Sequence, residues 1–582
     1  MLRQQIEQRL QEAVLRRFPD ADPASILVRP CPDERFGDYQ TNALIGLAKQ
    51  RRLNPRQLAT EIAADLGLDD LTEPPEVAGP GFVNFRLRPQ ALVALLARAA
   101  RGEHLFCQPD APPRTVVIDF SSPNVAKPMH VGHIRSTILG DCLARILRHL
   151  GHRVITDNHL GDWGTQFGML LVGWKTELDS DALARDAIAE LERIYRVINA
   201  RCSEDSPDHD PAVLERARAE LVKLQQGDPE NVAIWRRMIE LSREQFDAIY
   251  RRLDVRFDHT LGESFYNDRL PGVVASLLEK GIIRESEGAL VAFFDDVPAL
   301  KAHPAIVRKR DGAFNYTTTD LATLEYRWET WRPDEIIYVT DGRQQLHFQQ
   351  VFEIFRRWHP EVPTRLTHVW FGSILGENGQ PLKTRSGQNV KLADLLDEAE
   401  ERALRVVREK NPDLPAADQR EIARVIGIGA VKYADLLPNR QSDYVFSWDK
   451  MLALNGNTAP YLLYAATRIR SIFRKLEEAG ERFDPVAAAD RATLTEPTEL
   501  ALARMLERFD FVVHAVAAEY RPNYLCNYLY ELAGAFTAFY EACPVLRSEE
   551  PVRSSRLLLC HLVFKVLETG LGLLGIGIPE RM

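Results

Sequence analysis

The chain has 582 residues, 45% of them hydrophobic and 27% charged, with a formal net charge of −10 at pH 7. This length excludes a single hydrophobic core and predicts three or four domains. The composition is typical of soluble globular proteins, and no apolar run is long enough to cross a membrane, so no membrane partner is expected. The acidic balance excludes a chain that is basic overall, although it is compatible with a local basic face.

The cysteines and the first residues indicate where the chain works. Its seven cysteines are scattered without a CxxC pair, which fits a reducing cytosol and argues against a structural zinc site. Residues 1–17 have the pattern of an amphipathic helix and not of a signal peptide. We therefore expect a cytoplasmic protein with no metal-binding residues.

Residues 1–107 alternate helical patterns with short strands and predict an N-terminal α+β domain. The expected helices span 1–17, 41–52, 55–66 and 89–102, and the expected strands span 26–28 and 81–85. A proline-containing segment at 108–113 is the predicted linker to the next domain.

Residues 114–390 have the pattern of an α/β domain with a Rossmann-like parallel sheet. Apolar strands predicted at 116–120, 154–158, 335–340 and 368–371 alternate with helical stretches. A charged helical insertion is expected at about 176–256. In open parallel sheets the ligand lies beyond the carboxyl ends of the strands, so site residues are sought there.

From residue 391 onward the patterns are almost entirely helical. We predict a helical connecting region at 391–455, an α-helical bundle at 456–582 and a flexible apolar tail at 570–577. In the helix expected over 461–476, Tyr464 and Arg468 lie opposite the apolar face. Basic residues interleaved with tyrosines suit phosphate contact and base stacking, and an ordinary solvated face is the alternative.

One turn carries the strongest chemical signal in the chain. His130, Gly132 and His133 lie where the strand at 116–120 is followed by a helix that we expect to begin near residue 134. Such a place binds phosphates, because the first N–H groups of the helix are free and its dipole favours an anion. The alternative is a strand-to-helix turn that contains histidines incidentally.

Further polar residues lie before this turn and in a basic loop. Lys127 is close enough in sequence to reach the same anion, and Asn124 is able to hold a small polar group. The glycine-flanked segment at 379–388 contains Lys383 and Arg385, and such loops can close over phosphates. A solvated lysine and an exposed basic loop are the corresponding alternatives.

The turn and the loop together resemble the HIGH and KMSKS signatures of the class I aminoacyl-tRNA synthetases. The block at 124–133 is similar to the version found in bacterial arginyl-tRNA synthetases. Four more blocks resemble that family in order, and the resemblance spans essentially the whole chain. These blocks lie at 159–168, 262–266, 316–322 and 456–461.

One residue departs from the family pattern. Ser386 stands where KMSKS has its second lysine, and many bacterial arginine enzymes look similar at this point. Lys127 is the candidate substitute, because an ammonium is a point charge that can approach a phosphate from another side.

The resemblance implies ATP-dependent ligation of L-arginine to tRNA(Arg) through an arginyl-adenylate, with Mg²⁺ entering with ATP. His130 and His133 would stabilise the developing charge, and Lys127, Lys383 and Arg385 would bind the β- and γ-phosphates. Gly132 would let ATP approach the backbone closely. The resemblance also implies that adenylate formation needs tRNA.

Recognition of arginine requires carboxylates that match a planar guanidinium. By the resemblance, Glu263 and Asp320 supply them, Tyr316 lies on the same helical face as Asp320, and Asn124 and Gln344 hold the α-amino group. Helix caps and surface ion pairs are the alternative roles. Because such a site rejects uncharged analogues strongly, no editing domain is expected.

The resemblance assigns the helical bundle to the anticodon and the N-terminal domain to the tRNA elbow. The residues expected to contact tRNA are Tyr39, Asn84, Tyr461, Tyr464, Arg468 and Met582. We expect the enzyme to act as a monomer.

Three alternative functions would each require different features of the sequence. A cysteine synthetase would carry a zinc-binding Cys/His set, and a glutamate or glutamine synthetase would carry a basic pocket. A catalytically dead, RNA-binding relative would have lost the first signature. A small-molecule nucleotidyltransferase would be shorter and would lack the helical last third.

Overall fold

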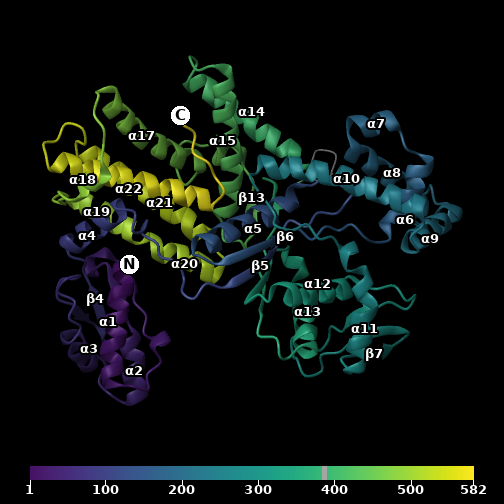
Figure 1. Ribbon diagram of the computed structural model, residues 1–582, viewed down its shortest axis with the longest axis horizontal. Helices are drawn as coiled ribbons and strands as arrows, with labels where there is room; N and C mark the ends of the chain where they lie inside the picture. The colour runs from purple at the N-terminus through teal and green to yellow at the C-terminus, as the bar shows by residue number, and fades with distance from the viewer. Residues whose placement is uncertain (383–389) are drawn as a thin grey trace.

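A computed structural model describes residues 1–382 and 390–582, and Figure 1 shows several bodies joined around a central parallel sheet. The N-terminal body lies at one end, the insertion lies at the other, and the C-terminal helices cover the centre. The predicted fold class, a Rossmann-like α/β domain flanked by an α+β domain and a helical bundle, is confirmed.

The N-terminal body packs helices against a four-stranded antiparallel sheet with strand order β1-β2-β4-β3. Its elements are α1 (Leu2–Arg17), β1 (Arg29–Pro30), β2 (Tyr39–Thr41), α2 (Ala43–Arg51), α3 (Pro55–Ala64), β3 (Glu76–Ala78), β4 (Phe82–Phe85) and α4 (Pro89–Ala100). The four predicted helices are confirmed within two residues. The strand predicted at 26–28 is wrong: Ile26 and Val28 are buried, but the strand begins at Arg29.

The central sheet is parallel throughout, with strand order β11-β10-β5-β6. Its strands are β5 (Thr115–Asp119), β6 (Arg153–Asp157), β10 (Glu335–Tyr338) and β11 (Arg365–His368). The strand predicted at 368–371 lies earlier in the chain, because β11 ends at His368. Between the strands run α5 (Val131–His149), α11 (Leu270–Glu279), α12 (Tyr316–Trp331) and α13 (Gln345–Trp358).

The insertion is helical, as predicted, and a small sheet that was not predicted follows it. The insertion helices are α6 (Gln166–Thr176), α7 (Ser180–Arg185), α8 (Ala187–Cys202), α9 (Pro211–Gln225) and α10 (Pro229–Arg252). The antiparallel strands β7 (Ile283–Ser286), β8 (Ala289–Ala292) and β9 (Ala305–Arg308) come before α12. These strands are four residues long, too short for their alternation to be recognised.

The C-terminal part is helical except for one short strand pair, β12 (Ile374–Leu375) with β13 (Tyr444–Val445). Its helices are α14 (Leu392–Lys410), α15 (Ala416–Leu436), α16 (Trp448–Met451), α17 (Ala459–Glu478), α18 (Pro485–Ala489), α19 (Pro497–Glu507), α20 (Phe509–Glu519), α21 (Asn523–Ala542) and α22 (Val552–Leu573).

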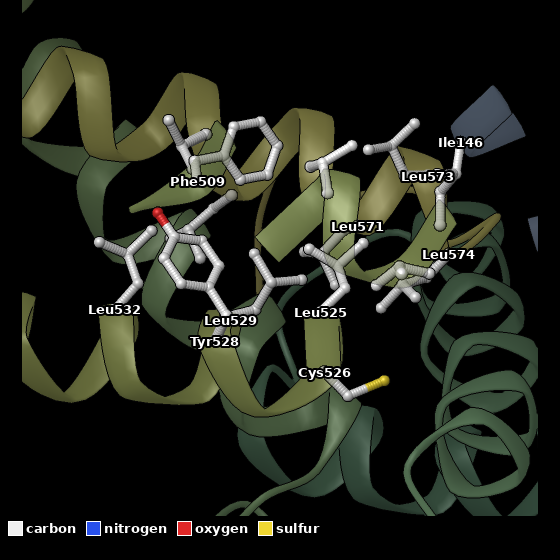
Figure 2. Packing of buried hydrophobic residues seen from close by; sticks show 14 of the residues in the cluster. Ile146, Phe509, Leu525, Cys526, Tyr528, Leu529, Leu532, Leu571, Leu573 and Leu574 are labelled. Carbon is white, nitrogen blue, oxygen red and sulfur yellow. The ribbon is translucent and has the colours of Figure 1, made fainter. Parts of the chain in front are cut away.

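The flexible tail predicted at 570–577 is wrong, because these residues belong to the core. Helix α22 continues to Leu573, and Leu574 and Ile576 are buried. Figure 2 shows Leu573 and Leu574 packed with Ile146 of α5, so the C-terminal helices share a core with the α/β domain. Hydrophobic burial there outweighs the flexibility of the glycines.

Buried ion pairs join the helices that carry the site to the sheet. Arg327 of α12 is fully buried and donates to Asp119 at 2.6 Å and to Asp157 at 2.9 Å, at the ends of β5 and β6. Arg135 of α5 pairs with Asp435 of α15 at 3.1 Å, and both are buried. Removing one partner of such a pair leaves an uncompensated buried charge, so these contacts fix the helices firmly.

Candidate active site

The turn between β5 and α5 lies at the carboxyl edge of the parallel sheet. Asn124 in this turn lies beside Gly161, which follows β6. The N–H of Val125 donates to the carbonyl of Gly161 at 3.1 Å, and the N–H of Gly161 donates to the carbonyl of Pro123 at 3.1 Å. A Cβ on Gly161 would lie 2.1 Å from Oδ1 of Asn124, so only glycine lets this amide lie flat against the backbone.

The backbone of the turn is strained and is braced by the insertion. Ser121, Ser122 and Ala126 have φ values of 73°, 47° and 61°, in the left-handed region that side chains rarely adopt. Oγ of Ser242 accepts the N–H of Ala126 at 3.0 Å, and the hydroxyl of Tyr250 contacts Oγ of Ser121 at 2.8 Å. Both bracing residues come from α10, a role that the sequence did not reveal.

His130 and His133 lie together, with ring centroids 4.0 Å apart. Nδ1 of His130 accepts the N–H of Gly132 at 3.0 Å, and Nδ1 of His133 accepts the N–H of His130 at 3.1 Å. Because both Nδ1 atoms accept, each neutral ring carries its proton on Nε2, which is then a donor.

The charge state of the two rings is set by their surroundings. Burial, together with the neighbouring His130, lowers the pKa of His133 to about 3. Burial and the positive charges of Arg343 and Lys127 lower the pKa of His130. Both rings are therefore neutral at physiological pH, and they can stabilise an oxyanion as hydrogen-bond donors and not as cations.

The first N–H groups of α5 are not free, which corrects one expectation from the sequence. The N–H of Val131 donates to the carbonyl of Val390 at 2.9 Å, and the N–H of His133 donates to the carbonyl of His130 at 2.9 Å. Gly132 donates to the ring of His130. An anion at this helix end would therefore meet imidazole N–H groups instead of backbone N–H groups.

The segment that follows the basic loop lies beside the histidine turn. The segment after the loop pairs with the turn: His130 forms an antiparallel bridge with Lys391, and the N–H of Leu392 donates to the carbonyl of Met129 at 2.9 Å. Lys383 and Arg385 themselves lie outside the described residues. The described residues that follow the loop, Val390 and Lys391, therefore lie next to His130 and Val131.

The charges of two cations, Arg343 and Lys127, act on His130 and lower its pKa. The side chain of Lys127 is exposed, and its Nζ lies 5.1 Å from the ring centroid of Tyr195 on α8. Arg343 is also exposed and pairs with Asp341 at 2.8 Å. The sequence singled out Lys127 but missed Arg343, whose only signal was its place next to Gln344.

Glu263 begins the 3₁₀ turn Glu263–Arg269, with its N–H donating to the carbonyl of Leu160 at 3.0 Å. This contact places Glu263 beside Gly161 and therefore near Asn124. Burial raises the pKa of Glu263 to about 7; the positive charge of His159 opposes this rise, and the negative charges of Asp320 and Asp162 add to it.

Asp320 and Tyr316 share the face of α12 that meets α13, and α12 begins at Tyr316, as expected. His347 of α13 contacts both of them. Its Nε2 lies 2.6 Å from Oδ2 of Asp320, and its ring centroid lies 4.7 Å from that of Tyr316. Gln344 is exposed at the start of α13, one turn before His347. The sequence missed His347, although its three-residue spacing from Gln344 on a helix was a usable signal.

Hydrogen bonds and charge interactions connect several residues predicted for the arginine pocket with one another and with the turn that precedes α5. Contacts link Asn124 to the Gly161 segment and that segment to Glu263, while charge links Glu263 to Asp320. Asp320 contacts His347 of α13, and Arg343, just before the start of α13, contributes to the lowered pKa of His130. The geometry offers two carboxylates for a guanidinium beside imidazole donors and cations for a triphosphate.

The residues expected to contact tRNA fall into two groups. Tyr39 and Asn84 are buried in the N-terminal sheet, at 1% and 5% exposure, so neither side chain is available to an RNA in this structure. This burial favours a structural role for both residues, the alternative to a tRNA contact. On α17, Tyr464 is 47% exposed, and Arg468 lies over its ring and over that of Tyr540. Tyr461 and Met582 are partly buried.

One group of possible metal ligands occurs in the described part of the chain. Side-chain atoms of Cys107, Asp510 and His514 lie within 4.8 Å of one another. Burial raises the pKa of the Cys107 thiol, so it stays protonated, and the backbone N–H of Gln108 already donates to Asp510 at 3.0 Å. A protonated thiol is a poor ligand, and we assign no metal to this group. No helix among residues 1–382 and 390–582 is both long and apolar enough to span a membrane.

Three family models match the chain. "Arginyl tRNA synthetase N terminal domain" matches residues 1–87, "tRNA synthetases class I (R), catalytic domain" matches residues 100–448, and "DALR anticodon binding domain" matches residues 462–582.

Similar proteins and structures cover the same length. The arginine–tRNA ligase of Chromobacterium violaceum is 46% identical over 587 residues, covering all of both chains. That of Escherichia fergusonii is 47% identical over 564 residues, covering 95% of each. The structure of Thermus thermophilus arginyl-tRNA synthetase has a TM-score of 0.82 at 28% identity and covers all of both chains.

Proposed function

The chain belongs to the arginyl-tRNA synthetase family, and from this membership we propose how its own residues perform the family's reaction. The enzyme is an arginine–tRNA ligase of class I. The carboxylate of arginine attacks the α-phosphorus of ATP, pyrophosphate leaves, and arginine then passes from the adenylate to a ribose hydroxyl of tRNA with release of AMP. Such a displacement needs mostly positioning and neutralisation of charge.

In the proposed arginine site, Glu263 and Asp320 bind the guanidinium, Tyr316 packs beside it, and Asn124 and Gln344 hold the α-amino group. The observation that carries this proposal is geometric: the N–H of Glu263 donates to the carbonyl of Leu160, next to the Gly161 that pairs with Asn124, and the negative charge of Asp320 acts on Glu263. A cationic substrate offsets their repulsion, whereas a neutral or acidic amino acid leaves it in place. This supports arginine over the substrates of other synthetases.

In the proposed ATP site, the Nε2–H groups of His130 and His133 donate to the phosphate oxygens. Gly132 contributes through its small size, since a Cβ there would lie 2.8 Å from the ring of His130. Lys127, Lys383 and Arg385 bind the β- and γ-phosphates, and Lys127 supplies the charge that Ser386 does not. Mg²⁺ would enter with ATP and would help to neutralise the charge of the triphosphate.

We further propose that tRNA lies along α17, with Tyr461, Tyr464, Arg468 and Met582 as contacts. The exposed aromatic and cationic side chains of this helix support it. We propose domain boundaries near residues 107, 390 and 455, which separate the N-terminal domain, the catalytic domain, the helical connecting region and the anticodon-binding domain. We also propose a cytoplasmic monomer: the seven cysteines are unpaired, as in a reducing compartment, and a single chain carries every described part of the site.

The test is ATP–pyrophosphate exchange with each of the twenty amino acids, with and without tRNA, in the wild type and in His133→Ala. We expect exchange with arginine, and a loss of about 10²–10³-fold in the variant, as for removal of one oxyanion donor. His149→Ala, at the exposed far end of α5, is the matched control and should retain full activity. Exchange that survives in His133→Ala would remove the phosphate role from this ring.

A further inference from the structure

His347 contacts two residues of the proposed arginine pocket, Asp320 and Tyr316. Its side chain is 14% exposed and lies between α12 and α13. Nε2 is 2.6 Å from Oδ2 of Asp320, and the ring meets that of Tyr316 edge to face. One imidazole on the helix that carries Gln344 therefore contacts the carboxylate and the aromatic ring of the facing helix.

The carboxylate of Asp320 determines the direction of the hydrogen bond with His347. An ionised carboxylate only accepts, so Nε2–H of His347 donates to Oδ2 of Asp320. Within the described residues, Oδ1 of Asp320 has no hydrogen-bond partner. The bond thus holds one oxygen and leaves the other for a ligand. A guanidinium presents its donors in a rigid plane, so its affinity depends on how the carboxylate is turned.

Joining the two helices does not require this bond. Leu321 and Leu324 of α12 share a buried apolar cluster with Phe348 and Val351 of α13. Burial of that apolar surface already fixes the helix pair. The short contact from His347 to Asp320 is therefore available for another role.

We propose that His347 is a positioning residue for substrate specificity, which turns the Asp320 carboxylate to receive the guanidinium of arginine. This inference rests on the proposed function, because it takes Asp320 to be a ligand of the substrate. His347 itself touches no reacting atom. Its loss should weaken arginine binding and leave the chemical step and ATP binding unchanged.

Three substitutions separate the hydrogen bond from the shape of the ring. His347→Phe keeps a ring beside Tyr316 but removes the donor. His347→Gln places an amide N–H near the position of Nε2, whereas the amide of His347→Asn is too short to reach it. Aminoacylation kinetics should show the KM for arginine raised about 10- to 100-fold in His347→Phe and His347→Asn, within about threefold of wild type in His347→Gln, and kcat and the KM for ATP little changed.

A double-mutant cycle with Asp320→Asn tests whether the effect passes through the carboxylate. If His347 acts by orienting Asp320, the double variant should have the KM of Asp320→Asn alone. The preference for arginine over citrulline, its neutral analogue, should fall in His347→Phe and be kept in His347→Gln. His359→Phe is the control, since His359 contacts Glu361 at 3.2 Å just after the same helix ends.

The outcomes distinguish the two levels of the proposal. If Asp320→Asn leaves the KM for arginine unchanged, the pocket assignment is wrong. If Asp320→Asn raises that KM but His347→Phe does not, or if the two effects add, the positioning role of His347 is overturned. An equal rise in the KM for ATP, or the same defect in His347→Gln, would show a general structural effect and would also overturn it.

Discussion

Glu263 should make the binding of arginine depend on pH near neutrality. Burial raises its pKa to about 7, against the charge of His159 and with the help of Asp320 and Asp162. The guanidinium of arginine is cationic at every pH of interest, so it binds the ionised carboxylate. Because the pKa is raised, the binding form is present above about pH 7 and is lost as the pH falls through that value.

The size of the effect follows from the ionised fraction of Glu263. A group with a pKa of about 7 is about nine-tenths ionised at pH 8 and about one-tenth ionised at pH 6. Apparent affinity scales with the fraction of the competent form, so the KM for arginine should rise roughly tenfold between pH 8 and pH 6. His133, with its pKa lowered to about 3, stays neutral across this range and adds nothing to the change.

Initial rates of aminoacylation from pH 5.5 to pH 8.5, at varied arginine, measure this dependence, and the KM for ATP is the internal reference. In Glu263→Gln the KM for arginine should be high at pH 8 and nearly independent of pH. Asp268→Asn, at an exposed acid of the same 3₁₀ turn, should behave as wild type. A flat kcat/KM for arginine between pH 6 and pH 8, or a slope that survives in Glu263→Gln, would refute the reasoning.

Three other substitutions test the packing around and beyond the site. Gly161→Ala should displace the Asn124 amide, because the new Cβ would lie 2.1 Å from its Oδ1, and should raise the KM for arginine about tenfold or more. The control Gly534→Ala, in open space on α21, should leave this KM unchanged. An unchanged KM in Gly161→Ala would contradict the role of Asn124. Burial raises the pKa of Glu507 to about 7, so its ionised carboxylate destabilises the folded state above that pH. Glu507→Gln should therefore raise the free energy of unfolding, measured in urea, by roughly 1–3 kcal/mol at pH 8 and leave it unchanged at pH 5. The opposite sign is expected for Glu499→Gln, whose equally buried acid pairs with Arg556 at 2.7 Å.

Much of the fold was predictable because it depends on local patterns. The apolar runs of β5 and β6 and the 3.6-residue period of α1 or α17 determine which residues can be buried together. The short strands β7, β8 and β9 were missed because four residues carry too little alternation. The tail at 570–577 was misjudged because its glycines suggest flexibility, while its burial depends on α5 and α21.

The sequence by itself determined the family, the order of the elements and the residue types available to the site, because these depend on spacing along the chain. Tertiary structure alone decided how those residues act. Contacts between residues far apart in sequence pair Val131 with Val390 and His347 with Asp320, and the burial of Tyr39 removes it from the surface. Burial and neighbouring charges, which no linear pattern encodes, leave His133 neutral and raise the pKa of Glu263 to about 7.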